Sequence, residues 1–108
     1  MPKEYRIYLE DIIESIRKIE KYTKGISYEE FAKNDLVIDG VVRNLEIIGE
    51  AVKRLPIEMK RQHHKIEWKK VAGLRDILIH EYSGVDPEII WDIIHTKLPS
   101  LKSALKRF

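Results

Sequence analysis

The chain has 108 residues, with 20 Lys or Arg against 18 Asp or Glu, and a formal net charge of +2. This length allows one hydrophobic core, so we expect a single domain over residues 1–108. The absence of cysteine excludes disulfides and thiolate metal sites, and the near-balanced charge excludes a protein that coats nucleic acid, so any RNA contact must be local. No apolar run approaches the roughly 20 residues that span a bilayer, and the charged start argues against a signal peptide, so we expect a cytoplasmic protein without a membrane segment.

The first half of the chain predicts three helices. From Tyr5 to Tyr22 apolar residues recur every three or four positions, which predicts an amphipathic helix closed by Gly25. Ser27-Tyr28-Glu29-Glu30 is a capping box that starts a short helix turning Phe31 inward. A third helix, from about Leu36 to Leu55, is apolar over so wide an arc that we expect its own domain and a partner chain to cover it. The sequence therefore indicates a homodimer.

The second half predicts two more helices. Residues 57–66 are polar and allow at most one helical turn, and a fourth helix spans about Trp68 to Tyr82, stopped by Ser83-Gly84. Asp86-Pro87 is an N-cap followed by proline, which opens a fifth helix that Pro99 should kink or break. We predict an all-α, up-and-down bundle of four or five helices with a kinked C-terminal helix.

The most informative motif is Arg-x-x-x-x-His-x-Tyr, formed by Arg75, His80 and Tyr82. In an ideal helix Tyr82 lies within about 20° of Arg75, whereas His80 lies about 140° away. Arg75 and His80 therefore meet only if the helix loosens or a second copy of the chain supplies the partner. A guanidinium binds phosphate oxygens and an imidazole titrates near neutrality, so the pair suits phosphodiester chemistry without a metal. From spacing alone, purely structural roles at a helix C-terminus stay open.

Several segments together resemble one known group of proteins, the HEPN superfamily (higher eukaryote and prokaryote nucleotide-binding domains). Within it the chain resembles the HepT-type toxins that are paired with a minimal nucleotidyltransferase antitoxin. The resemblance covers nearly the whole chain and rests on Tyr-Leu-Glu-Asp-Ile-Ile at 8–13, Ser-Tyr-Glu-Glu-Phe at 27–31, Arg-Asn-Leu-Glu-Ile-Ile-Gly-Glu-Ala at 43–51, Trp68, the motif from Arg75 to Tyr82, Val85-Asp86 leading to Trp91, and Leu98-Pro99-Ser100-Leu101.

The resemblance implies a function for the central motif. In this family the corresponding arginine, polar residue and histidine form a metal-independent ribonuclease site, which maps onto Arg75, Asp76 and His80 as catalytic residues. Close relatives commonly carry asparagine at the position of Asp76. The family tyrosine maps onto Tyr82, and the resemblance implies that the cognate nucleotidyltransferase silences the toxin by attaching adenylate to that hydroxyl. RNA is then the substrate, and no cofactor or metal is required.

Other residues are weaker candidates. Glu50 lies on the apolar third helix, where a carboxylate is costly unless paired, so we expect a pair with an arginine and keep an auxiliary role near the site as the alternative. His63 and His64 are adjacent and lack metal-ligand spacing. Trp68 and Trp91 should be core anchors.

Three functions remain open at this point. The first is a metal-independent ribonuclease toxin, and the second is a non-catalytic nucleotide- or protein-binding HEPN module. The third is a protein that serves solely as substrate and partner of a nucleotidyltransferase. The same arginine and histidine could bind a phosphate without breaking it, so the sequence does not separate these readings.

Overall fold

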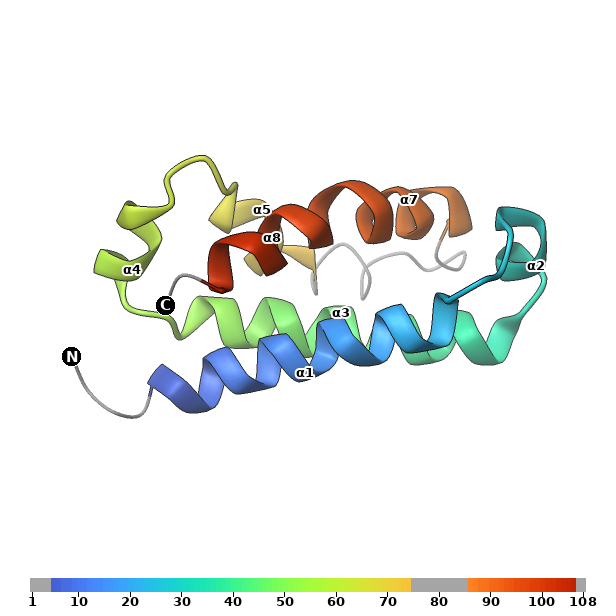
Figure 1. The fold of residues 1–108 in the computed structure, drawn as a ribbon, viewed down its shortest axis with the longest axis horizontal. Helices are drawn as coiled ribbons and strands as arrows, with labels where there is room; N and C mark the ends of the chain where they lie inside the picture. The colour runs from blue at the N-terminus through green and yellow to red at the C-terminus, as the bar shows by residue number, and fades with distance from the viewer. Residues whose placement is uncertain (1–4, 75–85, 107–108) are drawn as a thin grey trace.

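The computed structural model describes residues 5–74 and 86–106, and every regular element in these ranges is a helix. The predicted all-α fold is therefore confirmed. In Figure 1, α1 and α3 lie side by side, and the segment from α7 to α8 runs along the same direction above them. The helices are α1 (Tyr5–Thr23), α2 (Tyr28–Ala32), α3 (Asp35–Lys53), α4 (Ile57–Gln62), α5 (Trp68–Ala72), α7 (Pro87–Asp92), the π-helical turn η1 (Ile93–Lys97) and α8 (Leu98–Leu105).

One hydrophobic core holds these layers together, because each long helix turns its apolar stripe toward the others. Burying a large aliphatic side chain stabilises the fold by roughly 1.5–3 kcal/mol, so these residues supply most of the driving force. Among the described helices, none is both long and apolar enough to cross a bilayer. The core side chains that are almost fully buried are Ile12, Ile16, Ile19, Phe31, Val41, Leu45, Ile48, Val52, Met59, Ile90 and Leu101.

The turn between α1 and α3 forms as the sequence predicts. Gly25 has a positive φ of 76°, a conformation that glycine adopts without steric cost. The Glu30 backbone N–H donates to the Ser27 hydroxyl, and the Ser27 N–H donates to the Glu30 carboxylate, both at 3.2 Å. This capping box is confirmed, and it directs Phe31, which is fully buried, into the core.

The wide apolar arc of α3 is largely covered within the chain itself. Val41, Leu45 and Ile48 are fully buried, and α1, α2 and α5 all contact this helix. Leu36, at the start of α3, is the exception, with 83% of its surface exposed. The arc thus does not by itself require a second chain, and the homodimer stays a prediction.

Two predicted boundaries are wrong. The segment after Pro56 forms α4, whose six residues exceed one helical turn, because Met59 is buried at 1% exposure and anchors it. The predicted single helix from Trp68 to Tyr82 does not run through Gly73, since α5 ends at Ala72. Glycine is a poor helix former, and the Gly73 N–H caps the helix by donating to the Lys69 carbonyl at 2.9 Å.

Pro99 is predicted to kink or break the last helix, but the helix does not break there; a π-helical turn precedes the proline instead. The chain stays helical from Pro87 to Leu105, but η1 widens the backbone over Ile93–Lys97 before Pro99 enters α8. The Leu98 N–H donates to the Ile93 carbonyl, five residues back. A wider turn accommodates the proline ring and its missing N–H without breaking the helix.

Candidate functional site

The residues of the central motif, Arg75, Asp76, His80 and Tyr82, lie outside the described residues. Their predicted arrangement therefore stays a prediction, and the structure shows the elements on either side. On the N-terminal side of the motif, two residues are buried in the core. They are Val71 of α5, at 9% exposure, and Leu74, at 7% exposure. The motif begins at the very next residue, so its first position follows a fixed point in the core.

The chain returns to the described part at Asp86, and the predicted cap forms there. The Asp86 carboxylate accepts a hydrogen bond from the Glu88 backbone N–H at 2.9 Å, and Pro87 occupies the first turn of α7. Ile90, one turn later, is fully buried. Both ends of the motif segment are thus anchored, one by Leu74 and the other by α7.

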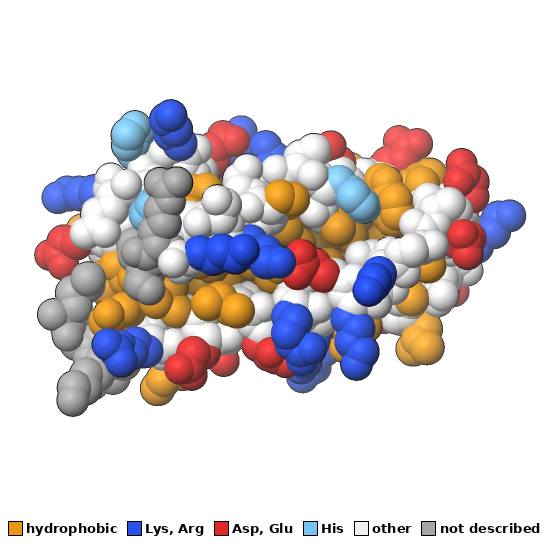
Figure 2. Space-filling model, viewed as in Figure 1, with side chains coloured by type: hydrophobic (Ala, Val, Ile, Leu, Met, Phe, Trp, Pro, Cys, Tyr) orange, Lys and Arg blue, Asp and Glu red, His pale blue; other side chains and the backbone are white. Residues whose placement is uncertain are grey.

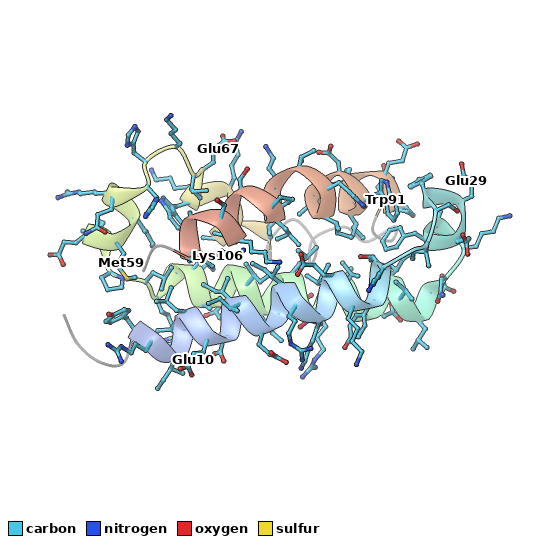
Figure 3. All side chains as sticks on the ribbon, viewed as in Figure 1. Glu10, Glu29, Met59, Glu67, Trp91 and Lys106 are labelled. Carbon is cyan, nitrogen blue, oxygen red and sulfur yellow. The ribbon has the colours of Figure 1, made fainter. Side chains whose placement is uncertain are left out.

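An aromatic cluster fixes α7 against α2. The Trp91 ring lies 5.8 Å from Tyr28 and 5.1 Å from Phe31, centroid to centroid, with interplanar angles of 71° and 46°. The His95 ring lies 4.3 Å from the Trp91 ring, centroid to centroid, and its Nδ1 lies 2.8 Å from the Trp91 carbonyl oxygen. Figure 3 shows Trp91 in the part of the molecule where α7 approaches α2. This indole packs against the core although it is only partly buried, as expected for a core anchor.

Trp68 anchors the opposite end of the molecule. Its indole N–H donates to the Lys60 carbonyl at 2.9 Å and to the His63 carbonyl at 3.1 Å. Each of these carbonyls also accepts a backbone hydrogen bond, Lys60 from the His63 N–H at 3.2 Å and His63 from the Ile66 N–H at 3.0 Å, so the indole is a second donor to the end of α4. Trp68 therefore ties α5 to α4 as well as packing against the core.

Glu50 forms the expected pair with an arginine. Its Oε1 lies 3.6 Å from Nη2 of Arg54, one turn along α3, and its side chain is 42% exposed. The carboxylate is therefore better solvated than its place on an apolar helix suggests. Its auxiliary role near the site stays a prediction.

The structure adds a feature that sequence reasoning missed, a groove of about 700 Å³ between α4 and α5. We call it the α4–α5 groove. The basic residues are visible in the sequence, but residues 57–66 are predicted to be a loop. A loop does not predict that their side chains lie on one surface. Its lining includes the basic side chains Lys53, Lys60, Arg61, His64, Lys69 and Lys70.

Metal ligands are not gathered in the described part of the chain. Within residues 5–74 and 86–106 no group of three or more His, Cys, Asp or Glu side chains could hold a metal ion. His63 and His64 follow the end of α4, and only His64 lines the α4–α5 groove. This arrangement gives no support to a zinc site at these two residues.

Comparison with known proteins places the chain in a family. The family described as "Ribonuclease HepT-like" matches residues 12–108, a range that includes the whole central motif. A protein of Caldanaerobacter subterraneus subsp. tengcongensis named "Putative RNase TTE0752" is 48% identical over 94% of this chain and 90% of its own length. The "Probable ribonuclease HepT" of Thermococcus cleftensis is 42% identical over 99% of this chain and 97% of its own.

A third relative is longer. The Methanocaldococcus jannaschii protein named "Gamma-glutamylcyclotransferase and putative RNase MJ0434" is 43% identical over 97% of this chain but only 47% of its own length. No solved structure matches the chain significantly.

The helical fold and the motifs are those of the HEPN superfamily. The chain belongs to the ribonuclease HepT-like family. The membership predicted from the sequence motifs is confirmed.

Proposed function

We propose that this chain is a metal-independent ribonuclease and acts as the toxin of a toxin–antitoxin pair. The observation that carries the proposal is the family match over residues 12–108, because this range includes Arg75, Asp76 and His80. The names of two relatives, "Putative RNase TTE0752" and "Probable ribonuclease HepT", support the same activity.

Each catalytic residue takes a role that follows from its chemistry. His80 removes the proton from a ribose 2′-hydroxyl, or donates one to the leaving oxygen, because an imidazole titrates near neutral pH. Arg75 holds the negative charge that develops on the phosphoryl oxygens as the new P–O bond forms and the old one breaks. Asp76 orients one of these two partners.

The test is RNA cleavage by the purified protein with EDTA present. Arg75→Ala and His80→Ala should each lower the rate by about 10²- to 10⁴-fold, the usual contribution of a general acid or base. Arg17→Ala is a matched control, because Arg17 is an exposed surface arginine paired with Glu14. Equal cleavage by wild type and the His80 variant would reject His80 as the general acid or base. Absence of cleavage by wild type would leave the non-catalytic binding module as the function, and loss of wild-type cleavage in EDTA alone would reject the metal-independent mechanism.

The proposal includes silencing by a minimal nucleotidyltransferase that adenylylates Tyr82. The phosphate of an adenylate on Tyr82 carries a negative charge, and Tyr82 is close to Arg75 in sequence. This phosphate would bind the Arg75 guanidinium and so compete with the phosphate of the substrate. The support is the family assignment, in which the tyrosine follows the histidine by two positions.

Intact-mass measurement after incubation with the nucleotidyltransferase, ATP and Mg²⁺ tests this step. The wild-type protein should gain one or more adenylates, and Tyr82→Phe should gain none. Tyr22→Phe is the matched control, because Tyr22 has 38% of its surface exposed and lies on α1, outside the motif. Modification of Tyr82→Phe at the wild-type level would assign the adenylate to another residue.

The proposal also includes a homodimer. Its support is the spacing of Arg75 and His80, which lie about 140° apart on an ideal helix, so that a second copy can supply the missing partner. Light scattering at micromolar concentration should give about twice the chain mass of 12.8 kDa. A monomer that cleaves RNA at full rate would contradict the shared site.

A further inference from the structure

The α4–α5 groove carries more positive charge than the rest of the molecule leads one to expect. The whole chain is nearly balanced at a net charge of +2, and the face in Figure 2 shows Lys and Arg side chains interspersed with Asp and Glu. The groove, in contrast, is lined by five Lys or Arg side chains and a single acidic one, Glu67. Such a local excess of one sign is the electrostatic footprint of a polyanion site.

The single acidic side chain is already neutralised. Glu67 lies 2.8 Å from Nζ of Lys70 and 3.6 Å from Nζ of Lys97, and Figure 3 shows it beside the start of α5. It therefore cannot serve as counter-ion for the other cations. Lys60, Arg61 and Lys69 form no ion pair with any described residue.

Lys60 is the most informative of these cations. It is half-buried, and burial lowers the pKa of its ammonium group below the ordinary value for lysine. A partly desolvated cation without a partner is costly to maintain in the free protein. A bound anion would remove that cost by supplying the missing counter-charge.

Trp68 fixes one wall of the groove, and the lining of the groove ends three residues before the motif in sequence. Trp68 lines it with its ring while its indole N–H holds the carbonyls of Lys60 and His63. Ala72, at the far end of α5, lines it as well, and three residues of chain from Ala72 to Arg75 span at most about 11 Å. An RNA strand that follows the groove therefore passes close to the start of the motif.

We propose that the α4–α5 groove binds the phosphate backbone of single-stranded RNA and leads it to the catalytic motif, with Lys60, Arg61 and Lys69 as its phosphate contacts. The inference rests on the proposed ribonuclease function for its substrate. Basic side chains beside an aromatic ring are the usual equipment for holding a single strand without reading its sequence. The groove then sets the affinity for RNA, and the motif carries out the cleavage.

The test measures RNA binding separately from cleavage. A labelled single-stranded RNA of about 16 nucleotides is titrated with His80→Ala protein, which keeps the RNA intact, by fluorescence anisotropy at several salt concentrations. The groove variant carries Lys60→Ala, Arg61→Ala and Lys69→Ala in addition. We expect the slope of log K against log salt to fall by about 2, because each single-strand contact contributes about 0.7. At 0.1 M salt the affinity should fall about 10- to 100-fold.

A charge-matched control separates the groove from the overall field of the protein. Lys21→Ala, Lys24→Ala and Lys33→Ala also remove three positive charges, from exposed side chains at the α2 end of the bundle. This control should bind RNA like the parent protein. If the triple groove variant does not fold, Lys60→Met, which keeps the apolar stem, should still lower the slope by about 0.7.

The outcomes are distinguishable from those of the catalytic proposal. In the His80-containing protein the groove variant should raise KM for RNA cleavage and leave kcat unchanged. If wild type does not cleave RNA but the groove variant still loses affinity, the groove assignment stands and the catalytic proposal alone fails. Equal RNA binding by the groove variant and the lysine control overturns the inference. Loss of binding to the nucleotidyltransferase, with RNA affinity intact, also overturns it and assigns the groove to a protein partner.

Discussion

The hydrogen bonds of Trp68 give a sharp prediction about stability. Trp68→Phe keeps an aromatic ring at the junction of α4 and α5 but removes the N–H that reaches the Lys60 and His63 carbonyls at 2.9 and 3.1 Å. Losing one shared donor costs about 1–1.5 kcal/mol, and the smaller ring adds a fraction of the usual large-to-small penalty. We expect the free energy of unfolding to fall by about 2 kcal/mol.

Trp91→Phe is the matched control for the change of ring size. The Trp91 indole N–H makes no hydrogen bond with the described residues, and its ring contacts are with Tyr28, Phe31 and His95. This variant loses only packing, so its cost should be about 1 kcal/mol. The difference between the two variants, about 1 kcal/mol, isolates the hydrogen bonds.

Urea denaturation followed by circular dichroism measures both values. The chain has two tryptophans, so each variant also retains one as a fluorescence reporter at the opposite end of the molecule. In a chain of this size 1 kcal/mol corresponds to about 4–8 °C in Tm. Equal destabilisation by Trp68→Phe and Trp91→Phe would refute the reasoning, because it would show that the Trp68 hydrogen bonds contribute nothing beyond ring size.

Three further predictions concern other parts of the fold. Phe31→Ala removes a fully buried ring and should cost about 3–5 kcal/mol by urea denaturation, with an unchanged m-value. The Glu20–Lys102 pair, 3.0 Å apart with side chains 50% and 42% exposed, should couple by less than about 1 kcal/mol in a double-mutant cycle and weaken with salt. The hydrogen bond from Lys70 holds the pKa of Glu67 below its ordinary value, so NMR titration of Lys70→Ala should show that pKa raised. Because the folded pKa is lowered, the contribution of Glu67 to stability is present above its unfolded pKa and is lost as pH falls through the folded value.

Local signals in the sequence were sufficient for most of the helices. The capping box at Ser27, the glycine turn at Gly25 and the Asp86-Pro87 start each act through neighbouring backbone groups, so their outcome depends little on distant residues. The period of apolar residues likewise fixed which face of α1 enters the core. The family assignment also came from the sequence, because it rests on residue identities over nearly the whole chain.

Tertiary structure decided what depends on contacts between distant segments. Burial of Met59 in the core stabilises α4 in a segment that is otherwise polar. The backbone cap at Gly73 ends α5 at Ala72, although the helical spacing of apolar residues in the sequence continues beyond this point. The α4–α5 groove appears only once Trp68 fixes the end of α4 against α5, which brings Lys60 and Lys69 to one surface. The net charge and the spacing of apolar residues are properties of the linear sequence. They do not predict which helix ends lie next to each other in the folded protein. The sequence by itself therefore determined most of the helices and the family, whereas the packing of α5 on α4 created the basic groove.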